Sequence, residues 1–165
     1  YMMPIYAQND TLNNVKSIFP YMFKTSDDGL YRPLTQDNAI EYGDNLTIGD
    51  IAIQTFAQTH GAGRSMGFRI GDIGYSTDVS EMTDAGLNAL KGIKTWIVDC
   101  GQYGALEEDL TVHPNLERVL RWNETVGADK LYLTHLTPRT DYKTANNETP
   151  DYIECAYDGL KIKVS

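Results

Sequence analysis

Three residues that could bind a metal ion follow three stretches of the sequence that are patterned like β-strands. His60, Asp78 and His135 come at or near the ends of these stretches, which span residues 46–56, 67–77 and 130–134. Alternation of apolar and polar residues predicts strands, so all three side chains should project from strand ends. Each also has an ordinary alternative, because an Asp at a strand end commonly caps a turn and a single His is commonly a hydrogen-bonded surface residue.

The length and composition are those of one ordinary domain. With 165 residues, of which 41% are hydrophobic and 22% charged, the chain can bury a core, and we expect residues 1–165 to form a single domain. The apolar runs are too short to cross a membrane, and the chain does not open with a secretory leader. We therefore expect a cytoplasmic protein without a membrane partner.

The net charge of −9 argues against a protein that binds nucleic acid nonspecifically, because phosphate backbones are held by clustered Lys and Arg. We expect no nucleic-acid partner. A local basic pocket for a small acidic or nucleotide ligand remains an alternative, with Arg64 and Arg69 as its candidate residues.

The two cysteines, Cys100 and Cys155, lie far apart in apolar, strand-like runs. This pattern favours two buried thiols over a disulfide, and neither spacing matches a zinc cluster. No Gly-x-Ser-x-Gly or Cys/His signature indicates a covalent nucleophile.

The rest of the chain alternates strand-like and helix-like segments, which predicts an α/β fold. Strands are expected at residues 3–7, 39–42, 94–100 and 130–134, with a hairpin of residues 152–157 and 160–164 across Asp158-Gly159. Helices are expected to begin at an Asp10 N-cap, at residue 84 and near His113-Pro114. Turn-forming residues predict irregular structure at residues 24–45 and 137–150, and a joint at residues 61–65.

Four short segments carry a resemblance to a known family. They are Thr77-Asp78-Val79-Ser80, Trp96-Ile-Val-Asp-Cys100, the run Leu133-Thr-His135-Leu, and Ala156-Tyr-Asp-Gly-Leu160. Together they resemble the second half of a metallo-β-lactamase-fold hydrolase. The similarity favours the branch that includes phosphoribosyl 1,2-cyclic phosphate phosphodiesterase and, more distantly, ribonuclease Z. It implies a half or incomplete αββα sandwich, with a mixed sheet and covering helices.

The resemblance implies a centre of two divalent metal ions, Zn or Mn, in the complete enzyme. Asp78 would bridge the two ions, and His60 and His135 would each complete one of them. A metal-bound hydroxide would then hydrolyse a phosphodiester or cyclic phosphate of a small-molecule substrate. Asp78 is therefore expected to be both a metal ligand and a catalytic residue.

His113 stands just ahead of an expected helix, where the phosphodiesterases of this family place a His that faces the substrate. The resemblance implies that it donates a proton to the leaving oxygen, a role that suits an imidazole near neutral pH. Its alternative is an exposed, idle His, since the family's fuller Pro-His-Pro-Thr-His pattern is reduced here to Val112-His113-Pro114. Asp99 ends its strand nearby and would either orient a metal-bound imidazole or cap a turn.

The family's His-x-His-x-Asp-His motif does not occur in this sequence, which contains three His in all. Each ion would keep two protein donors, fewer than the three of catalytic zinc sites, so this chain alone should bind metal weakly or partially. The chain opens with Tyr1, and we expect an amino-terminal half, a second chain or self-association to complete the site and cover the sheet. The alternative function is a non-catalytic remnant or interaction subunit that keeps the fold and pairs with a partner chain.

Overall fold

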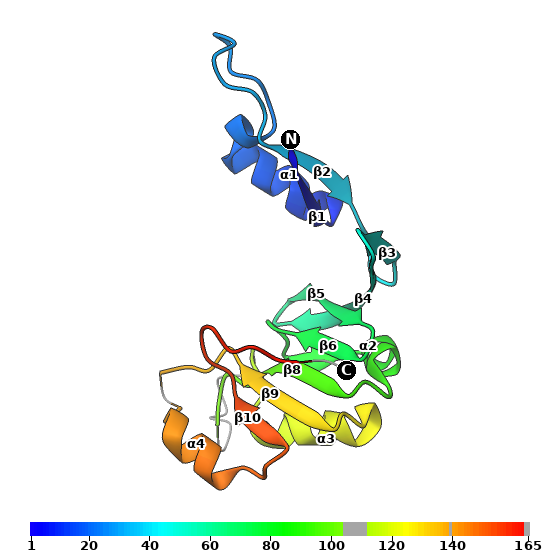
Figure 1. Cartoon of the computed structure of the whole chain (residues 1–165), viewed down its shortest axis with the longest axis vertical. Coiled ribbons are helices and arrows are strands. Elements are labelled where there is room, and N and C mark those ends of the chain that lie inside the picture. Colours follow the sequence, from blue (N-terminus) through cyan, green and yellow to red (C-terminus); the bar gives the residue numbers. More distant parts are fainter. Residues whose placement is uncertain (104–111, 139, 164–165) are drawn as a thin grey trace. The chain divides into compact units, whose positions relative to one another are not determined.

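The computed structural model describes residues 1–103, 112–138 and 140–163, which fall into two compact units. The first unit is Tyr1–Asp44 and the second is Asn45–Ser165 (Figure 1). The expectation of one domain across residues 1–165 stays a prediction. The candidate site residues all belong to the second unit.

The first unit is a β-α-β arrangement. Strand β1 (Met3–Ala7) pairs in parallel with β2 (Thr35–Ala39), and between them the chain forms α1 (Asn9–Ile18) and the short 3-10 helix η1 (Pro20–Met22). A parallel pair requires such a crossover, because no tight turn can join its strands. Two expected boundaries were wrong: the N-cap of α1 is Gln8 instead of Asp10, and β2 ends at Ala39, where the expected strand at residues 39–42 begins.

The second unit is built on an eight-stranded mixed sheet, as the expected fold class requires. Its strand order is β10-β9-β8-β6-β5-β4-β3, and β7 pairs with β4 outside that path. The strands are β3 (Asn45–Ile48), β4 (Ile51–His60), β5 (Gly63–Ile70), β6 (Ile73–Ser76), β7 (Glu81–Met82), β8 (Thr95–Asp99), β9 (Lys130–Thr134) and β10 (Ile153–Cys155). Strands β6, β8, β9 and β10 pair in parallel, whereas β3, β4, β5 and β6 pair antiparallel.

Each alternating run ahead of His60 and Asp78 proves to be a hairpin rather than one strand. The first run turns between β3 and β4 at Gly49, and the second turns between β5 and β6 at Gly71. Their φ angles of +64° and +58° lie in the left-handed region, which glycine enters without a steric penalty. Strand β5 already begins at Gly63, so the joint after β4 is shorter than the expected residues 61–65.

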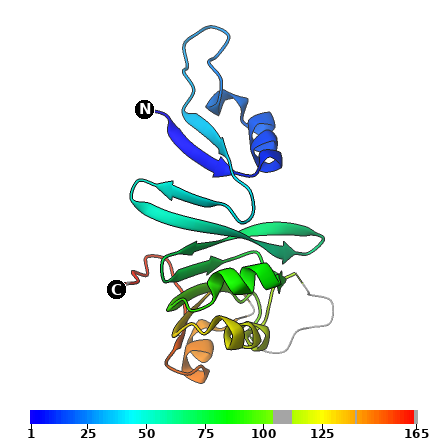
Figure 2. The same ribbon diagram turned by 90° about the vertical axis from the view of Figure 1, so that its right-hand side faces the viewer.

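Helices α2 (Asp84–Leu90) and α3 (Leu116–Val126) lie side by side over one face of the sheet (Figure 2). The side chains of Thr83 and Asn115 cap them by accepting hydrogen bonds from backbone N–H groups of their first turns. Pro114 precedes α3 instead of opening its first turn. No helix formed by the described residues has both the length and the apolar character needed to cross a membrane.

Alternate residues of the central strands fill the core beneath these helices. Trp96 and Val98 of β8 and Leu131 and Leu133 of β9 are fully buried, and they join a hydrophobic cluster that includes Val119 and Trp122 of α3. The residues between them face the other side of the sheet. There Tyr75, Ile97 and Tyr132 are partners in register across β6, β8 and β9, and Tyr75 remains 40% exposed.

The carboxy-terminal part differs most from expectation. The expected irregular segment 137–150 contains a helix, α4 (Tyr142–Glu148), which Asp141 caps by accepting a hydrogen bond from the Thr144 N–H at 2.7 Å. The expected hairpin across Asp158-Gly159 is also wrong. Residue Gly159 does make a turn, with φ +89°, but β10 pairs in parallel with β9 and described residues 160–163 form no strand. The last expected strand residue, Val164, lies outside the described part.

The buried thiols predict low reactivity toward alkylating reagents. Burial raises the pKa of the Cys100 thiol to about 12 and also raises the pKa of Cys155, so little thiolate exists near neutral pH. We expect iodoacetamide at about pH 8 to label neither residue in the folded chain and both residues in denaturant. An Ile51→Cys variant, at a position 50% exposed, should be labelled at once. Rapid labelling of the folded parent chain would contradict the prediction.

Candidate metal and catalytic site

Four strands bring polar side chains to the same edge of the sheet. Strands β6, β8 and β9 are parallel, and β4 also runs in their direction, because two antiparallel pairings separate it from β6. His60 ends β4, Asp99 ends β8, and Asp78 and His135 follow β6 and β9. Carboxyl ends of strands that run the same way share one edge, which is where α/β sheets build sites.

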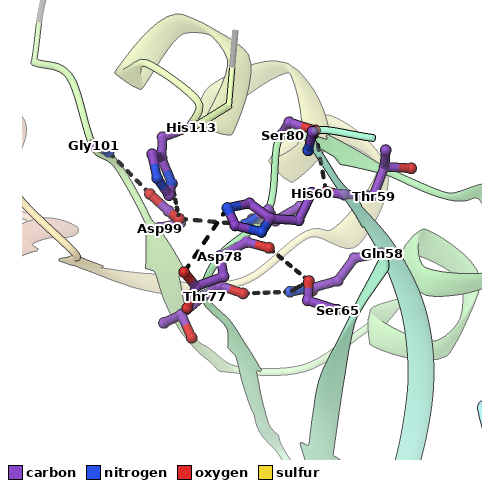
Figure 3. A network of polar contacts seen from close by, with 12 residues as sticks. Gln58, Thr59, His60, Ser65, Thr77, Asp78, Ser80, Asp99, Gly101 and His113 are labelled. Atoms are coloured by element: carbon purple, nitrogen blue, oxygen red, sulfur yellow. Dashed lines mark hydrogen bonds and ion pairs between the residues drawn. The ribbon is translucent and has the colours of Figure 1, made fainter. Parts of the chain in front are cut away.

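The structure brings together all four residues expected from the sequence to form the site. The Nε2 atom of His60 lies 3.9 Å from an Asp78 carboxylate oxygen (Figure 3). The His113 ring stands between the other two imidazoles: its centroid is 5.3 Å from that of His60 and 4.5 Å from that of His135, against which it stacks. The convergence holds although these residues are spread over 76 positions from His60 to His135.

Asp99 orients His113. Its carboxylate lies 2.9 Å from His113 Nδ1 and also accepts hydrogen bonds from the backbone N–H groups of Gly101 and Val79. The Asp99 side chain is fully buried, whereas that of His113 is 25% exposed. Asp99 was expected to orient a metal-bound imidazole or to cap a turn, and its observed partner is the candidate proton donor. With Nδ1 engaged, the other ring nitrogen of His113 is left for chemistry.

The environment of Asp99 acts on its pKa in two directions. Burial raises the pKa of the Asp99 carboxyl above its usual range, and the hydrogen bond from His113 offsets only part of that rise. Both carboxyl oxygens accept backbone amides, an arrangement that suits the ionised form. The pair therefore resembles a carboxylate that holds one imidazole in a fixed orientation.

Asp78 and His135 have strained backbones. Their φ angles are +53° and +59°, and they are the non-glycine residues with positive φ in the described part of the chain. The left-handed region is sterically costly for residues with a side chain, and such residues cluster at functional sites. Two of the three expected metal ligands therefore carry a conformational cost that regular strand ends would avoid.

The residues present fit a divalent metal ion. The Nε2 atom of His60 is buried and has no hydrogen-bond partner among the described atoms, although an unpaired buried nitrogen is costly. Its 3.9 Å separation from the Asp78 oxygen is too long for a hydrogen bond. It is within the sum of a zinc–nitrogen and a zinc–oxygen distance, about 4.0–4.3 Å. Asp99, His113 and His135 also each offer a ligand atom, all within 4.8 Å of one another.

The alternative basic ligand pocket finds little support. Arg69 donates hydrogen bonds to the backbone carbonyls of Gly71, Ala89 and Lys91, so its guanidinium closes the end of α2. Arg64 is exposed on β5.

Gly101 is a site residue that was not expected from the sequence. A Cβ at this position would lie 2.6 Å from the Cβ of His113, so the glycine leaves room for the imidazole. The one signal for it was a glycine two residues after Asp99.

The family model described as "Beta-lactamase superfamily domain" matches residues 2–136. The chain belongs to the β-lactamase superfamily. This confirms the resemblance, and a solved metallo-β-lactamase fold protein, YhfI from Bacillus subtilis, superposes with a TM-score of 0.74 at 21% identity. That alignment covers 96% of this chain and 64% of YhfI.

The chain is also similar to two further proteins, in each case over only part of that protein's length. The crystal structure of a new diphosphatase from the PhnP family has a TM-score of 0.83 and 23% identity, and the alignment covers 98% of this chain and 58% of that one. The Octanoyltransferase of Porphyromonas gingivalis is 20% identical over 162 residues, which are 96% of this chain and 32% of that protein. This superfamily chain therefore spans less than two thirds of each of these three proteins.

Because Gly101 lies close to His113, we expect a larger residue at position 101 to displace the His113 ring. In Gly101→Ala the new Cβ would collide with the His113 Cβ at 2.6 Å, so we expect the ring to shift and its bond to Asp99 to lengthen. Overpacking of this kind costs about 1–3 kcal/mol in the free energy of unfolding. Nitrogen NMR of the imidazole should report the altered Nδ1 hydrogen bond.

Gly63→Ala is the matched control, because a Cβ at Gly63 would meet its nearest neighbour at an ordinary 3.7 Å. We expect its His113 resonances to match the parent chain. Unchanged His113 resonances in Gly101→Ala would show that the contact does not position the ring.

Proposed function

We propose that this chain is part of a metal-dependent hydrolase that cleaves a phosphodiester or cyclic phosphate in a small molecule. The observation that carries the proposal is the convergence of His60, Asp78, His113 and His135 at one edge of the sheet. Superfamily membership supports a hydrolytic function. The similarity to the solved diphosphatase from the PhnP family supports a phosphate substrate. A cytoplasmic location, expected from the sequence, is part of the proposal.

His60, Asp78 and His135 would hold two divalent ions, Zn or Mn, with the Asp78 carboxylate shared between them. When bound, such ions polarise a phosphoryl oxygen and lower the pKa of a coordinated water to near neutrality. Imidazole and carboxylate donors accept both metals. The buried, unpaired Nε2 of His60 supports this assignment, because a metal ion would supply its missing partner.

His113 would deliver a proton to the leaving oxygen. Its Nδ1 is engaged by the Asp99 carboxylate, which leaves Nε2 as the nitrogen that would face the leaving oxygen. Its 25% side-chain exposure would allow contact with a substrate. In this arrangement Asp99 positions His113 and does not touch the substrate.

The proposal includes a partner. Two donors for each ion are fewer than the three that catalytic zinc usually has, so further ligands would come from an amino-terminal half, a second chain or another copy. The row of Tyr75, Ile97 and Tyr132 on the sheet face away from α2 and α3 supports a partner there, because Tyr75 is 40% exposed.

Substitution of the shared carboxylate tests the proposal. We expect hydrolysis of bis-p-nitrophenyl phosphate with Mn or Zn when the chain is combined with a segment that supplies the His-x-His-x-Asp-His motif. Asp78→Ala should abolish this activity, because both ions lose a ligand. The control Asp50→Ala, at an exposed turn between β3 and β4, should retain it. Full activity of Asp78→Ala would exclude the proposed centre.

The role of His113 as proton donor can be tested by how its substitution depends on the leaving group of the substrate. His113→Gln should lower kcat by about 100- to 10,000-fold for substrates with poor leaving groups. The loss should be smaller for p-nitrophenyl ester substrates, because p-nitrophenolate leaves without protonation. An equal loss for both substrate classes would contradict the role of general acid.

The second candidate function is a non-catalytic subunit that keeps the fold and uses the exposed sheet face to pair with another chain. The exposure of Tyr75 in the row of Tyr75, Ile97 and Tyr132 favours this function. It predicts a stable dimer in light scattering and no stoichiometric metal by elemental analysis. Two transition-metal ions per chain would count against this alternative.

A further inference from the structure

A buried polar pair lies beneath the turn that carries Asp78. Gln58 of β4 is fully buried, and Ser65 is its partner in register on β5. The Gln58 amide nitrogen donates to the Ser65 hydroxyl at 3.1 Å and to the backbone carbonyl of Thr77 at 2.6 Å. The Ser65 hydroxyl donates to the carbonyl of Asp78 at 2.6 Å. Two successive carbonyls of the turn are therefore held from below (Figure 3).

The other side of the turn is held as well. The Val79 N–H donates to the Asp99 carboxylate, and the Ser80 N–H donates to the Thr59 carbonyl at 2.7 Å. Every residue from 77 to 80 thus has a backbone group tied to the sheet. Asp78 lies in the middle of this segment with its φ of +53°. A strained conformation persists only where its surroundings determine it, and these contacts supply that determination.

The buried Gln58 side chain carries an energetic cost. Its carbonyl oxygen is buried without a hydrogen-bond partner among the described atoms, and an apolar residue would avoid that penalty. Its amide cannot be flipped without losing the bond to the Thr77 carbonyl, which requires a donor. Gly67 makes room for the Phe56 ring and for Gln58, since a Cβ there would lie 2.1 Å from the ring and 2.7 Å from the Gln58 carbonyl oxygen.

We propose that Gln58 and Ser65 are positioning residues that hold Asp78 in its left-handed conformation and so keep its carboxylate beside His60. The inference rests on the proposed function in treating Asp78 as a metal ligand. Neither residue needs to touch metal or substrate. Their effect passes through two backbone carbonyls to one side chain.

The test combines metal affinity with the backbone conformation of residue 78. Ser65→Ala removes one hydrogen bond to the turn, and Gln58→Met removes the other together with the unpaired oxygen. In the chain combined with a segment that supplies the His-x-His-x-Asp-His motif, we expect each substitution to weaken Co²⁺ binding, measured by visible absorption, by about three- to tenfold. Crystal structures should show residue 78 leaving the left-handed region or its carboxylate moving away from His60.

Two controls separate positioning from general destabilisation. Ser65→Thr keeps the hydroxyl and should restore parental affinity. Ser76→Ala removes the bond from the Trp96 indole at 3.1 Å, another buried serine contact, and should lower the melting temperature without changing Co²⁺ affinity. Gln58→Met should change the melting temperature little, because it also removes the unpaired oxygen.

The outcomes are distinct. Parental Co²⁺ affinity together with an unchanged φ at residue 78 in both Ser65→Ala and Gln58→Met would overturn the inference. If the parent chain binds no Co²⁺ even when combined with that segment, the proposed function loses its metal centre. The conformation of residue 78 in the two variants then decides the positioning role by itself, with an unchanged conformation again overturning it.

Discussion

The site depends on four strands of one sheet running in the same direction. Parallel pairing fixes this for β6, β8 and β9, and the β4–β5–β6 meander restores the direction for β4. Side chains at the carboxyl ends of such strands gather at one edge regardless of their distance in sequence. His60 and His135 can therefore share a site with Asp78, and the helices that cover Trp96 and Leu131 stabilise the same strands from one face.

A second layer of polar contacts keeps the gathered side chains in place. Asp99 is buried and holds His113 while also binding the backbone beside Asp78, so one carboxylate links two parts of the site. Gln58 and Ser65 act on the opposite side of the Asp78 turn. Exposed ion pairs contribute little to stability, whereas buried hydrogen bonds of this kind define geometry because leaving them unmade is costly.

The parts of the fold that could be predicted are those with a local signal. Continuous apolar runs identified β8 and β9 within a residue or two, and the apolar residues of the segment that begins at residue 84 identified α2. The alternating runs before His60 and Asp78 were not divided into hairpins, because their apolar pattern continues across Gly49 and Gly71. Helix α4 has a polar sequence with little periodicity, so its Asp141 cap was the one local signal available.

The Asp158-Gly159 signal shows the opposite failure. Its turn forms, but a hairpin also needs two segments that pair with each other, and β10 pairs with β9 instead. The site was predicted at the level of which residues stand at strand ends. It was not predicted that Asp99 would select His113, because their pairing depends on a chain path that no local pattern encodes.

The reversal at β5 limits how the chain can be rebuilt. Direction along a meander alternates, so a strand returns to its original orientation after an even number of turns. Adding or deleting one strand between β4 and β6 would send the imidazole of His60 to the opposite rim of the sheet. An insertion between β4 and β6 therefore keeps His60 at the same edge as Asp78 only if it adds two strands, as a hairpin, or lengthens an existing turn.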